Sequence, residues 1–198
     1  MRNVLHLAVS LTIMFSLLQC SQKSNTSSIE SSLQVDIPST MDLVERGNYL
    51  VTTIGCDHCH TPKIMTPQGP VPDMERWLMG YPSQDPLPKI NKNELGPDKW
   101  VLLNNDLTAA VGPWGVSFAA NLTPHQTGLG NWTFEQFEKA MTEGKYKGVE
   151  NTRILLPPMP WQSYASMKDE DLRAIYEYLK SIKPIENLVP NHISPNSY

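Results

Sequence analysis

Cysteine is scarce in this sequence of 198 residues, which holds three cysteines, at positions 20, 56 and 59. A structural zinc site usually needs a second C-x-x-C or a histidine pair, and no cysteine follows Cys59. The strand–helix alternation that surrounds a redox C-x-x-C is also missing, since the segment before Cys56 has a helical period. Zinc binding and thiol chemistry are therefore the weaker alternatives for this pair. All three cysteines have predicted chemical roles that use their sulfur atoms, so no disulfide is expected.

A strong net charge of either sign is lacking as well. The formal net charge is -4 at pH 7. Nucleic-acid binding proteins present a basic patch or stripe, so this balance argues against a nucleic acid as partner. The charge is too small to identify a protein partner, because a docking patch depends on the fold.

The N-terminal apolar stretch, from Val4 to Leu18, is too short for a membrane span of about 20 residues. With Arg2 before it, the stretch is typical of a bacterial export signal. Leu17-Leu18-Gln19-Cys20 resembles a lipoprotein processing box, which predicts a signal peptide over residues 1–19 and a lipid on Cys20. Ordinary cleavage nearby and an uncleaved anchor are the alternatives. A multi-acyl anchor would hold the protein on a membrane.

Large apolar residues are few between Ser21 and Thr40, where seven residues are serine. Such a segment cannot bury enough surface to offset its ordering entropy, so residues 20–40 are predicted to be a flexible tether. The remaining residues, 41–198, have the length of one domain.

The most informative motif that is present is Cys56-Asp57-His58-Cys59-His60, the C-x-x-C-H attachment sequence of c-type haem. Two residues between the cysteines let both sulfurs reach the haem vinyl groups from one turn of helix. The imidazole of His60 follows directly and can bind the iron. We therefore predict one covalent haem c, with Cys56 and Cys59 as thioether attachments and His60 as an axial ligand. Attachment of this kind happens outside the cytoplasm, in agreement with the export signal.

Three helices are predicted around this motif. The first carries an apolar face that runs into it, and the second begins after Thr133 with Gln136 completing a capping box. The third spans Met167 to Ile182, with Ser166 as N-cap and Asp169 at the reciprocal position. Their predicted inward faces are Leu43, Gly47, Leu50, Val51 and Ile54; Phe134, Phe137 and Met141; and Leu172, Ile175, Tyr176, Leu179 and Ile182.

Between Pro62 and Gly130 the composition changes, because ten of the 17 prolines and seven of the 11 glycines lie there. The stretch also carries three tryptophans, whereas disordered linkers are poor in aromatics. We expect ordered loops with a short hairpin around Trp100–Leu103 and Val116–Ala119. So long a loop is usually functional, and here it is expected to wrap the haem edge and exclude water.

The second axial position is predicted to belong to Met159, which lies in Leu155-Leu156-Pro157-Pro158-Met159-Pro160-Trp161. A thioether is a soft, neutral ligand that suits the reduced metal, and the three prolines present it on a stiff backbone. His125 is the main rival. His58 cannot reach the distal face from within the attachment loop. Three further methionines in the loop stretch stay open as candidates: Met65, Met74 and Met79.

The order of N-terminal helix, C-x-x-C-H, proline-flanked methionine and C-terminal helix resembles that of class I cytochromes c. The resemblance implies an all-α fold whose terminal helices cross at a contact between a glycine and an aromatic residue. Gly47 and Tyr176 would be the matching pair. The long Pro/Gly-rich loop, residues 63–120, would be an insertion between the haem motif and the half that carries the distal ligand.

A narrower resemblance is to the haem domains of cytochrome subunits that serve membrane-bound alcohol and aldehyde dehydrogenases. It covers roughly residues 45–62 and 112–184. Those subunits commonly carry two or three haem motifs, and this chain has one. The matching stretches are Glu45 to Val51, Cys56 to Pro62, Asn121 to Pro124, Thr127 to Thr133, Leu155 to Trp161 and Asp169 to Ile175. The position after Pro124 is often acidic in those subunits and is His125 here.

Taken together, the sequence predicts a monohaem cytochrome c, anchored by lipid and facing the periplasm, that transfers single electrons and is not itself an enzyme. The expected partners are redox proteins: a dehydrogenase, a quinol-oxidising complex or a terminal oxidase. The alternative is a haem enzyme or a gas or redox sensor, which would need an open distal site in place of Met159.

Overall fold

The computed structural model describes residues 39–96 and 98–197. The predicted signal peptide, the lipid site at Cys20 and nearly all of the predicted tether lie outside these residues. None of the helices in the described part is long and apolar enough to cross a membrane. The α-helices are α1 (Thr40–Thr53), α2 (Cys56–His60), α3 (Phe134–Thr142), α4 (Trp161–Tyr164) and α5 (Asp169–Ser181). The strands are β1 (Lys63–Thr66), β2 (Gly69–Pro72), β3 (Leu102–Leu103), β4 (Ala109–Gly112) and β5 (Gly115–Phe118).

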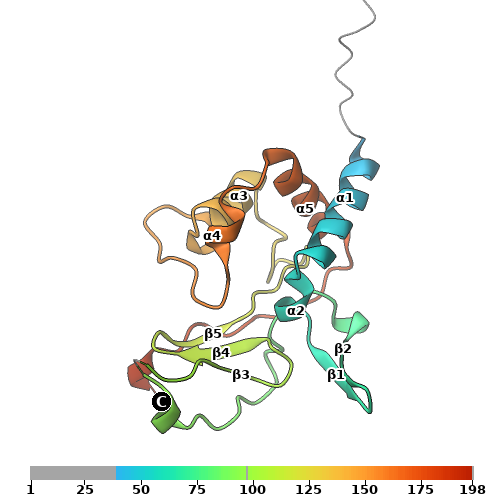
Figure 1. The fold of residues 1–198 in the computed structure, drawn as a ribbon. Helices are drawn as coiled ribbons and strands as arrows, with labels where there is room; N and C mark the ends of the chain where they lie inside the picture. Colours follow the sequence, from blue (N-terminus) through green and yellow to red (C-terminus); the bar gives the residue numbers. More distant parts are fainter. Residues whose placement is uncertain (1–38, 97, 198) are drawn as a thin grey trace, which may run out of the picture. The chain divides into compact units, whose positions relative to one another are not determined.

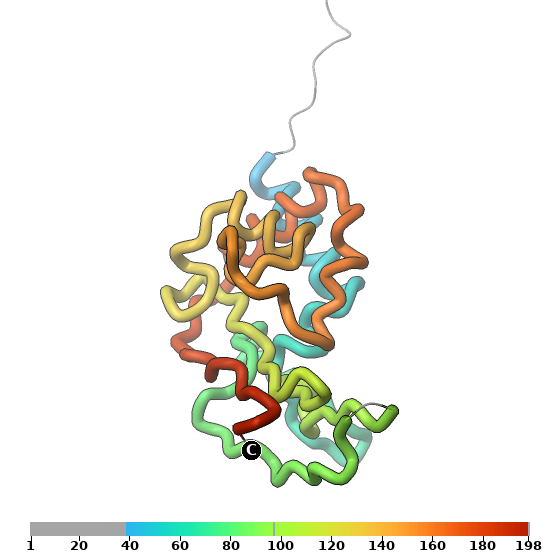
Figure 2. The backbone as a smooth tube through the Cα atoms, turned by 90° about the vertical axis from the view of Figure 1, so that its left-hand side faces the viewer, coloured from blue at the N-terminus to red at the C-terminus, as the bar shows by residue number. Residues whose placement is uncertain are grey.

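Figure 1 shows α1, α3, α4 and α5 gathered in one half of the described part, with both small sheets in the other half. Helix α2 lies where the two halves meet, and the turned view in Figure 2 shows the same division. The predicted class I arrangement of helices is therefore present, but the described chain also contains strands, so all-α describes only its helical half.

Helix α1 forms as predicted from its apolar face and begins at a cap. The Ser39 side chain accepts a hydrogen bond from the Asp42 amide, and the Asp42 side chain binds the Ser39 amide in return. Gly47, Leu50 and Val51 are buried on the predicted face. Because this face continues to the end of the helix, packing of α1 fixes the start of the haem motif.

Helices α1 and α5 cross at Gly47, as predicted, but the aromatic partner is not Tyr176. A Cβ atom at Gly47 would lie 2.0 Å from the Ala174 carbonyl oxygen and 2.6 Å from the Tyr178 Cβ. Ala174 and Tyr178 are four residues apart and share one face of α5. Tyr176 lies on another face, where its hydroxyl donates to the Trp132 carbonyl oxygen at 2.8 Å. The predicted pairing of Gly47 with Tyr176 is therefore wrong, because the face of α5 that meets Gly47 is rotated about half a turn from Tyr176.

The starts of the other two helices differ in how well they were predicted. The capping box of Thr133 and Gln136 at α3 is confirmed. The predicted Ser166 cap is wrong, because α5 begins at Asp169 with Lys168 as its N-cap residue and no side-chain cap. The amide of Met167 donates instead to the Tyr164 carbonyl oxygen at 3.0 Å, so this stretch is a turn after α4. Acidic residues in the first turn of α5 complement the helix dipole.

The hydrophobic core joins α1, α3 and α5 to the segments that flank the strands. It confirms most of the predicted inward positions. Its buried members are Leu50, Val51, Leu78, Leu129, Phe137, Met141, Leu172, Ala174, Ile175 and Leu179. Met159 and Cys56, which lie about a hundred positions apart in the sequence, are both partly buried against this one cluster.

The described residues of the 63–120 segment form strands and short 3-10 helices, so the segment is ordered there as predicted, but its strand pairing differs from the prediction. Strands β1 and β2 form a hairpin, with Ile64 opposite Val71. The second sheet has the order β3-β4-β5, all antiparallel. The predicted partners at Leu102–Leu103 and Val116–Phe118 do not pair with each other, because each pairs with β4 between them. Strand β4 was missed because its Ala-Ala-Val-Gly sequence carries little strand signal.

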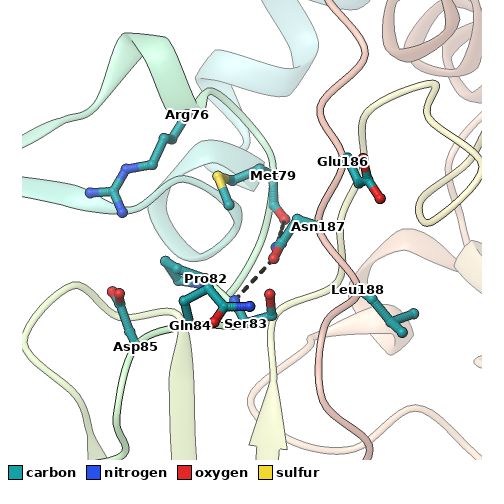
Figure 3. Close-up of a pocket in the computed structure, with 9 residues that line it drawn as sticks. All are labelled: Arg76, Met79, Pro82, Ser83, Gln84, Asp85, Glu186, Asn187 and Leu188. Carbon is teal, nitrogen blue, oxygen red and sulfur yellow. Dashed lines mark hydrogen bonds between the residues drawn. The ribbon is translucent and has the colours of Figure 1, made fainter.

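The buried Asn187 ties the C-terminal segment to the 63–120 segment. Its side-chain amide donates to the carbonyl oxygens of Met79 and Tyr81 at 2.7 and 2.9 Å, and its oxygen accepts from the Ser83 amide. Figure 3 shows Asn187 between two of these partners, Met79 and Ser83, with a dashed line to each. In Figure 2 the red C-terminal segment runs beside the green part of the chain, and Ile193 pairs with Val116 there. Because the bonds of Asn187 are buried or partly buried, the two segments hold each other in place.

Candidate haem site

Helix α2 consists of the five residues of the haem motif, Cys56–His60. Gly55 stands before it with a φ of 79°, a left-handed conformation that suits glycine and turns the chain from α1 into α2. Cys56 and Cys59 are three residues apart on one helical turn, and both are free thiols that are partly buried. The predicted attachment geometry, with both sulfurs on one helical turn, is therefore present.

His60 ends this helix and is buried. Its Nδ1 lies 2.7 Å from the Ala120 carbonyl oxygen. A carbonyl oxygen can only accept, so Nδ1 carries the proton and the Nε2 lone pair is left available to a metal. Burial lowers the pKa of His60, and the positive charge of Lys63 acts in the same direction, while the bond to Ala120 opposes them. These influences favour the neutral imidazole, which is the form that coordinates iron.

The two cysteine thiols share a protected environment. Burial raises the pKa of the Cys56 thiol to about 12, and burial also raises the pKa of Cys59. Tyr164, in α4, lies close to both. Burial raises the pKa of Tyr164, and the charges of Cys56 and Cys59 add to that rise. Tyr164, which follows Met159 in the chain, therefore lies within electrostatic range of the attachment motif.

Met159 lies in the loop between α3 and α4. Its amide donates to the Leu156 carbonyl oxygen at 3.3 Å, and the Pro157 carbonyl oxygen before it accepts a hydrogen bond from the Ser117 hydroxyl. Met159 is partly buried against the core cluster that Cys56 also contacts. The structure thus brings the predicted ligand loop and the attachment motif into contact with the same core cluster.

The rival ligands are placed differently. The Nδ1 atom of His125 lies within hydrogen-bond distance of the Thr127 hydroxyl, at 2.9 Å. The backbone carbonyl of His125 accepts hydrogen bonds from the amides of Gly128 and Gly130, which form a turn. Met65 and Met74 are each 66% exposed, so in this structure they do not line a buried site. Met79 is buried, and its carbonyl oxygen is bound by Asn187. His58 is exposed on α2.

A pocket of about 530 Å³ lies between Arg76–Asp85 and Glu186–Leu188 (Figure 3). Its lining includes none of the four predicted haem residues. Two features of the haem site itself were missed by sequence reasoning: the Ala120 carbonyl and the side chain of Tyr164. A backbone carbonyl has no sequence signature, and nothing in the pattern around Tyr164 distinguishes it from a core residue.

The profile of the cytochrome c family matches residues 44–183, which is more than half of the chain. The chain therefore belongs to the cytochrome c family, as the sequence predicted. Proteins of this family are electron carriers with covalently attached haem c. The residues that would hold that group, two free thiols on one helical turn and an imidazole with a committed Nδ1, fit it. The chain thus carries a cytochrome c domain whose residues fit a covalently attached haem c.

Three relatives illustrate the similarity. The gluconate 2-dehydrogenase cytochrome c subunit of Pantoea cypripedii is 29% identical over 72% of this chain and 24% of its own length. The fructose dehydrogenase cytochrome subunit of Gluconobacter japonicus is 37% identical over 39% of this chain and 16% of its own. The cytochrome c subunit of the quinone alcohol dehydrogenase of Gluconobacter oxydans is 34% identical over 40% of this chain and 17% of its own. The matched region thus spans at most about a quarter of these relatives.

Proposed function

We propose that the protein carries single electrons between redox partner proteins outside the cytoplasm, through a low-spin haem c whose iron is bound by His60 and Met159. The observation that carries this proposal is that His60 keeps Nε2 available while Met159 and Cys56 pack against one core cluster. The bound haem supplies the one-electron chemistry, by cycling between ferric and ferrous iron.

The chain's own residues hold and tune that group. Cys56 and Cys59 are the attachment points, and the Ala120 carbonyl fixes the orientation of the His60 ring. A methionine opposite a histidine raises the reduction potential, because a neutral thioether favours ferrous iron. With His60 and Met159 both holding the iron, no ligand position would be left for a substrate.

The partner class follows from the relatives. The three described above are named as cytochrome subunits of dehydrogenases, for gluconate, fructose and alcohol. We infer that this chain receives electrons from a dehydrogenase or a quinol-oxidising complex, or passes them on to a terminal oxidase. One haem motif in the chain suits a relay between partners better than a chain of haems within one subunit.

Replacement of the distal methionine tests the ligand assignment. Met159→Ala should abolish the weak long-wavelength charge-transfer band that Met-ligated ferric haem shows, and should lower the midpoint potential, because water or a nitrogen ligand favours ferric iron. Met167→Ala is the matched control, since Met167 is also partly buried against the core cluster. That variant should keep both the band and the potential. An unchanged band in Met159→Ala would show that another residue is the ligand.

Membrane attachment is the second part of the proposal and rests on Leu17-Leu18-Gln19-Cys20. We expect the mature protein to begin at a lipid-modified Cys20 and to face the periplasm. Cys20→Ala should release a soluble haem protein or leave the precursor uncleaved, and mass spectrometry of the N-terminus distinguishes these outcomes. An unmodified N-terminus elsewhere, in wild-type protein from native cells, would rule out lipidation.

A further inference from the structure

Lys63 is the third residue after His60 and the first residue of β1. Its side chain turns back onto the end of α2. The ammonium group donates to the carbonyl oxygens of Asp57 and His58, at 3.3 and 2.9 Å, and also to that of Thr61. The last carbonyls of a helix lack amide partners in the next turn. Here the Asp57 carbonyl also accepts from the Thr61 amide, and the Lys63 ammonium binds it together with the carbonyls of His58 and of the C-cap residue Thr61.

The charge of Lys63 is held in place and partly shielded from water. The side chain is half-buried, and burial lowers the pKa of Lys63, while the carboxylates of Asp106 and Asp57 favour its charged form. Asp57 is itself buried, and its Oδ1 has no hydrogen-bond partner in the structure, so Asp57 depends on nearby positive charge. Lys63 and Asp106 also line one shallow pocket.

The position of this charge relates it to the proximal ligand. Two of the three carbonyls that Lys63 binds, those of His58 and Thr61, belong to residues on either side of His60. The His60 ring is buried, and its Nδ1 binds the carbonyl oxygen of Ala120, at the far end of the 63–120 segment. Lys63 therefore adds a fixed cation to the half of the site that holds the histidine. A cation near a redox centre disfavours the more positive oxidation state.

We propose that Lys63 is a positioning residue of the haem site, which closes the carbonyl end of the attachment helix and raises the reduction potential through its charge. This inference rests on the proposed function, since it concerns the same haem. It assigns the start of the 63–120 segment a role in setting the potential of the iron, in addition to its packing against the helices.

Three variants, purified as the full haem-loaded protein, test the proposal by potentiometric titration. Lys63→Met removes the charge but keeps an unbranched side chain, and should lower the midpoint potential. Lys63→Arg keeps the charge and should stay close to wild type. Asp106→Asn removes the nearby negative charge and should raise the potential. These opposite shifts follow from charge and would not follow from packing.

The outcomes separate this proposal from the proposed function. A wild-type protein without covalent haem or without the methionine charge-transfer band would overturn the proposed function itself. With both present, an unchanged potential in Lys63→Met, or equal falls in Lys63→Met and Lys63→Arg, would overturn the role of the charge. If Lys63→Met yields no haem protein, the test rests on Asp106→Asn. A midpoint potential that does not rise in Asp106→Asn would contradict the proposal.

Discussion

At the scale of single residues, the haem site depends on groups that lie far from the motif in sequence. The cysteines and His60 lie within five residues of each other and were predicted as haem-binding residues from their spacing alone. The partner of the His60 ring lies 60 residues away and is a backbone carbonyl. Tyr164, which lies close to both thiols, is 105 residues from Cys59 (164 − 59). A motif can name the groups that bind a cofactor, but the groups that orient them come from the fold.

The attachment residues can be tested by removing both sulfurs. A protein with Cys56→Ala and Cys59→Ala should lose all covalent haem, because each thioether bond needs one of these thiols. Haem staining after denaturing electrophoresis measures this. Cys56→Ala alone is the control, since one thioether would remain and staining should persist. A double variant that still stains would contradict the assignment of these cysteines.

At the scale of elements, helices with local signals were predicted well. The apolar face of α1 and the capping box of α3 are both encoded within a few residues, and both are confirmed. The start of α5 was missed because Ser166 and Asp169 fit a capping pattern, but the turn after α4 uses the Met167 amide instead. The capping pattern in the sequence was therefore overridden by the turn after α4, which a local pattern does not predict.

Pairings between elements were predicted less well. Gly47 was recognised as a crossing point, but the face of α5 that meets it depends on how the helix is rotated. Ala174 and Tyr178 face Gly47, and Tyr176 does not. The strand around Leu102–Leu103 was also recognised, whereas its partner β4 has too weak a sequence signal to be found without the structure.

The close crossing of α1 and α5 gives a stability prediction. Gly47→Ala should lower the free energy of unfolding by about 2 kcal/mol, even though alanine favours a helix by about 1 kcal/mol over glycine. The reason is that the added Cβ would lie 2.0 Å from the Ala174 carbonyl oxygen, so the helices must move apart. Chemical denaturation of the haem-loaded protein measures the loss.

Asn48→Ala is the matched control for this prediction, since Asn48 is the neighbouring residue on α1 and is exposed. Its effect should stay within about 0.5 kcal/mol. Equal stability of Gly47→Ala and wild type would mean that the two helices do not approach as closely as the structure indicates.

At the scale of the whole described part, the 63–120 segment and the helical half share one site. The segment contacts the haem motif at both of its ends, through Lys63 and through the Ala120 carbonyl. The C-terminal segment provides a third contact to the 63–120 segment, through the hydrogen bond from Asn187 to the Met79 carbonyl oxygen. Sequence composition predicted order here but could not predict these long-range bonds, which join residues up to 108 positions apart.

The central claim is that the protein closes both axial positions of its haem and therefore carries electrons without binding a substrate. The optical spectrum of the ferrous wild-type protein, recorded with and without carbon monoxide, tests it most directly. The proposed ligation by His60 and Met159 predicts two nearly identical spectra, and predicts that Met159→Ala gains carbon monoxide binding because its sixth position opens. A wild-type spectrum that shifts readily on adding carbon monoxide would contradict the claim and would point to a haem enzyme or a gas sensor.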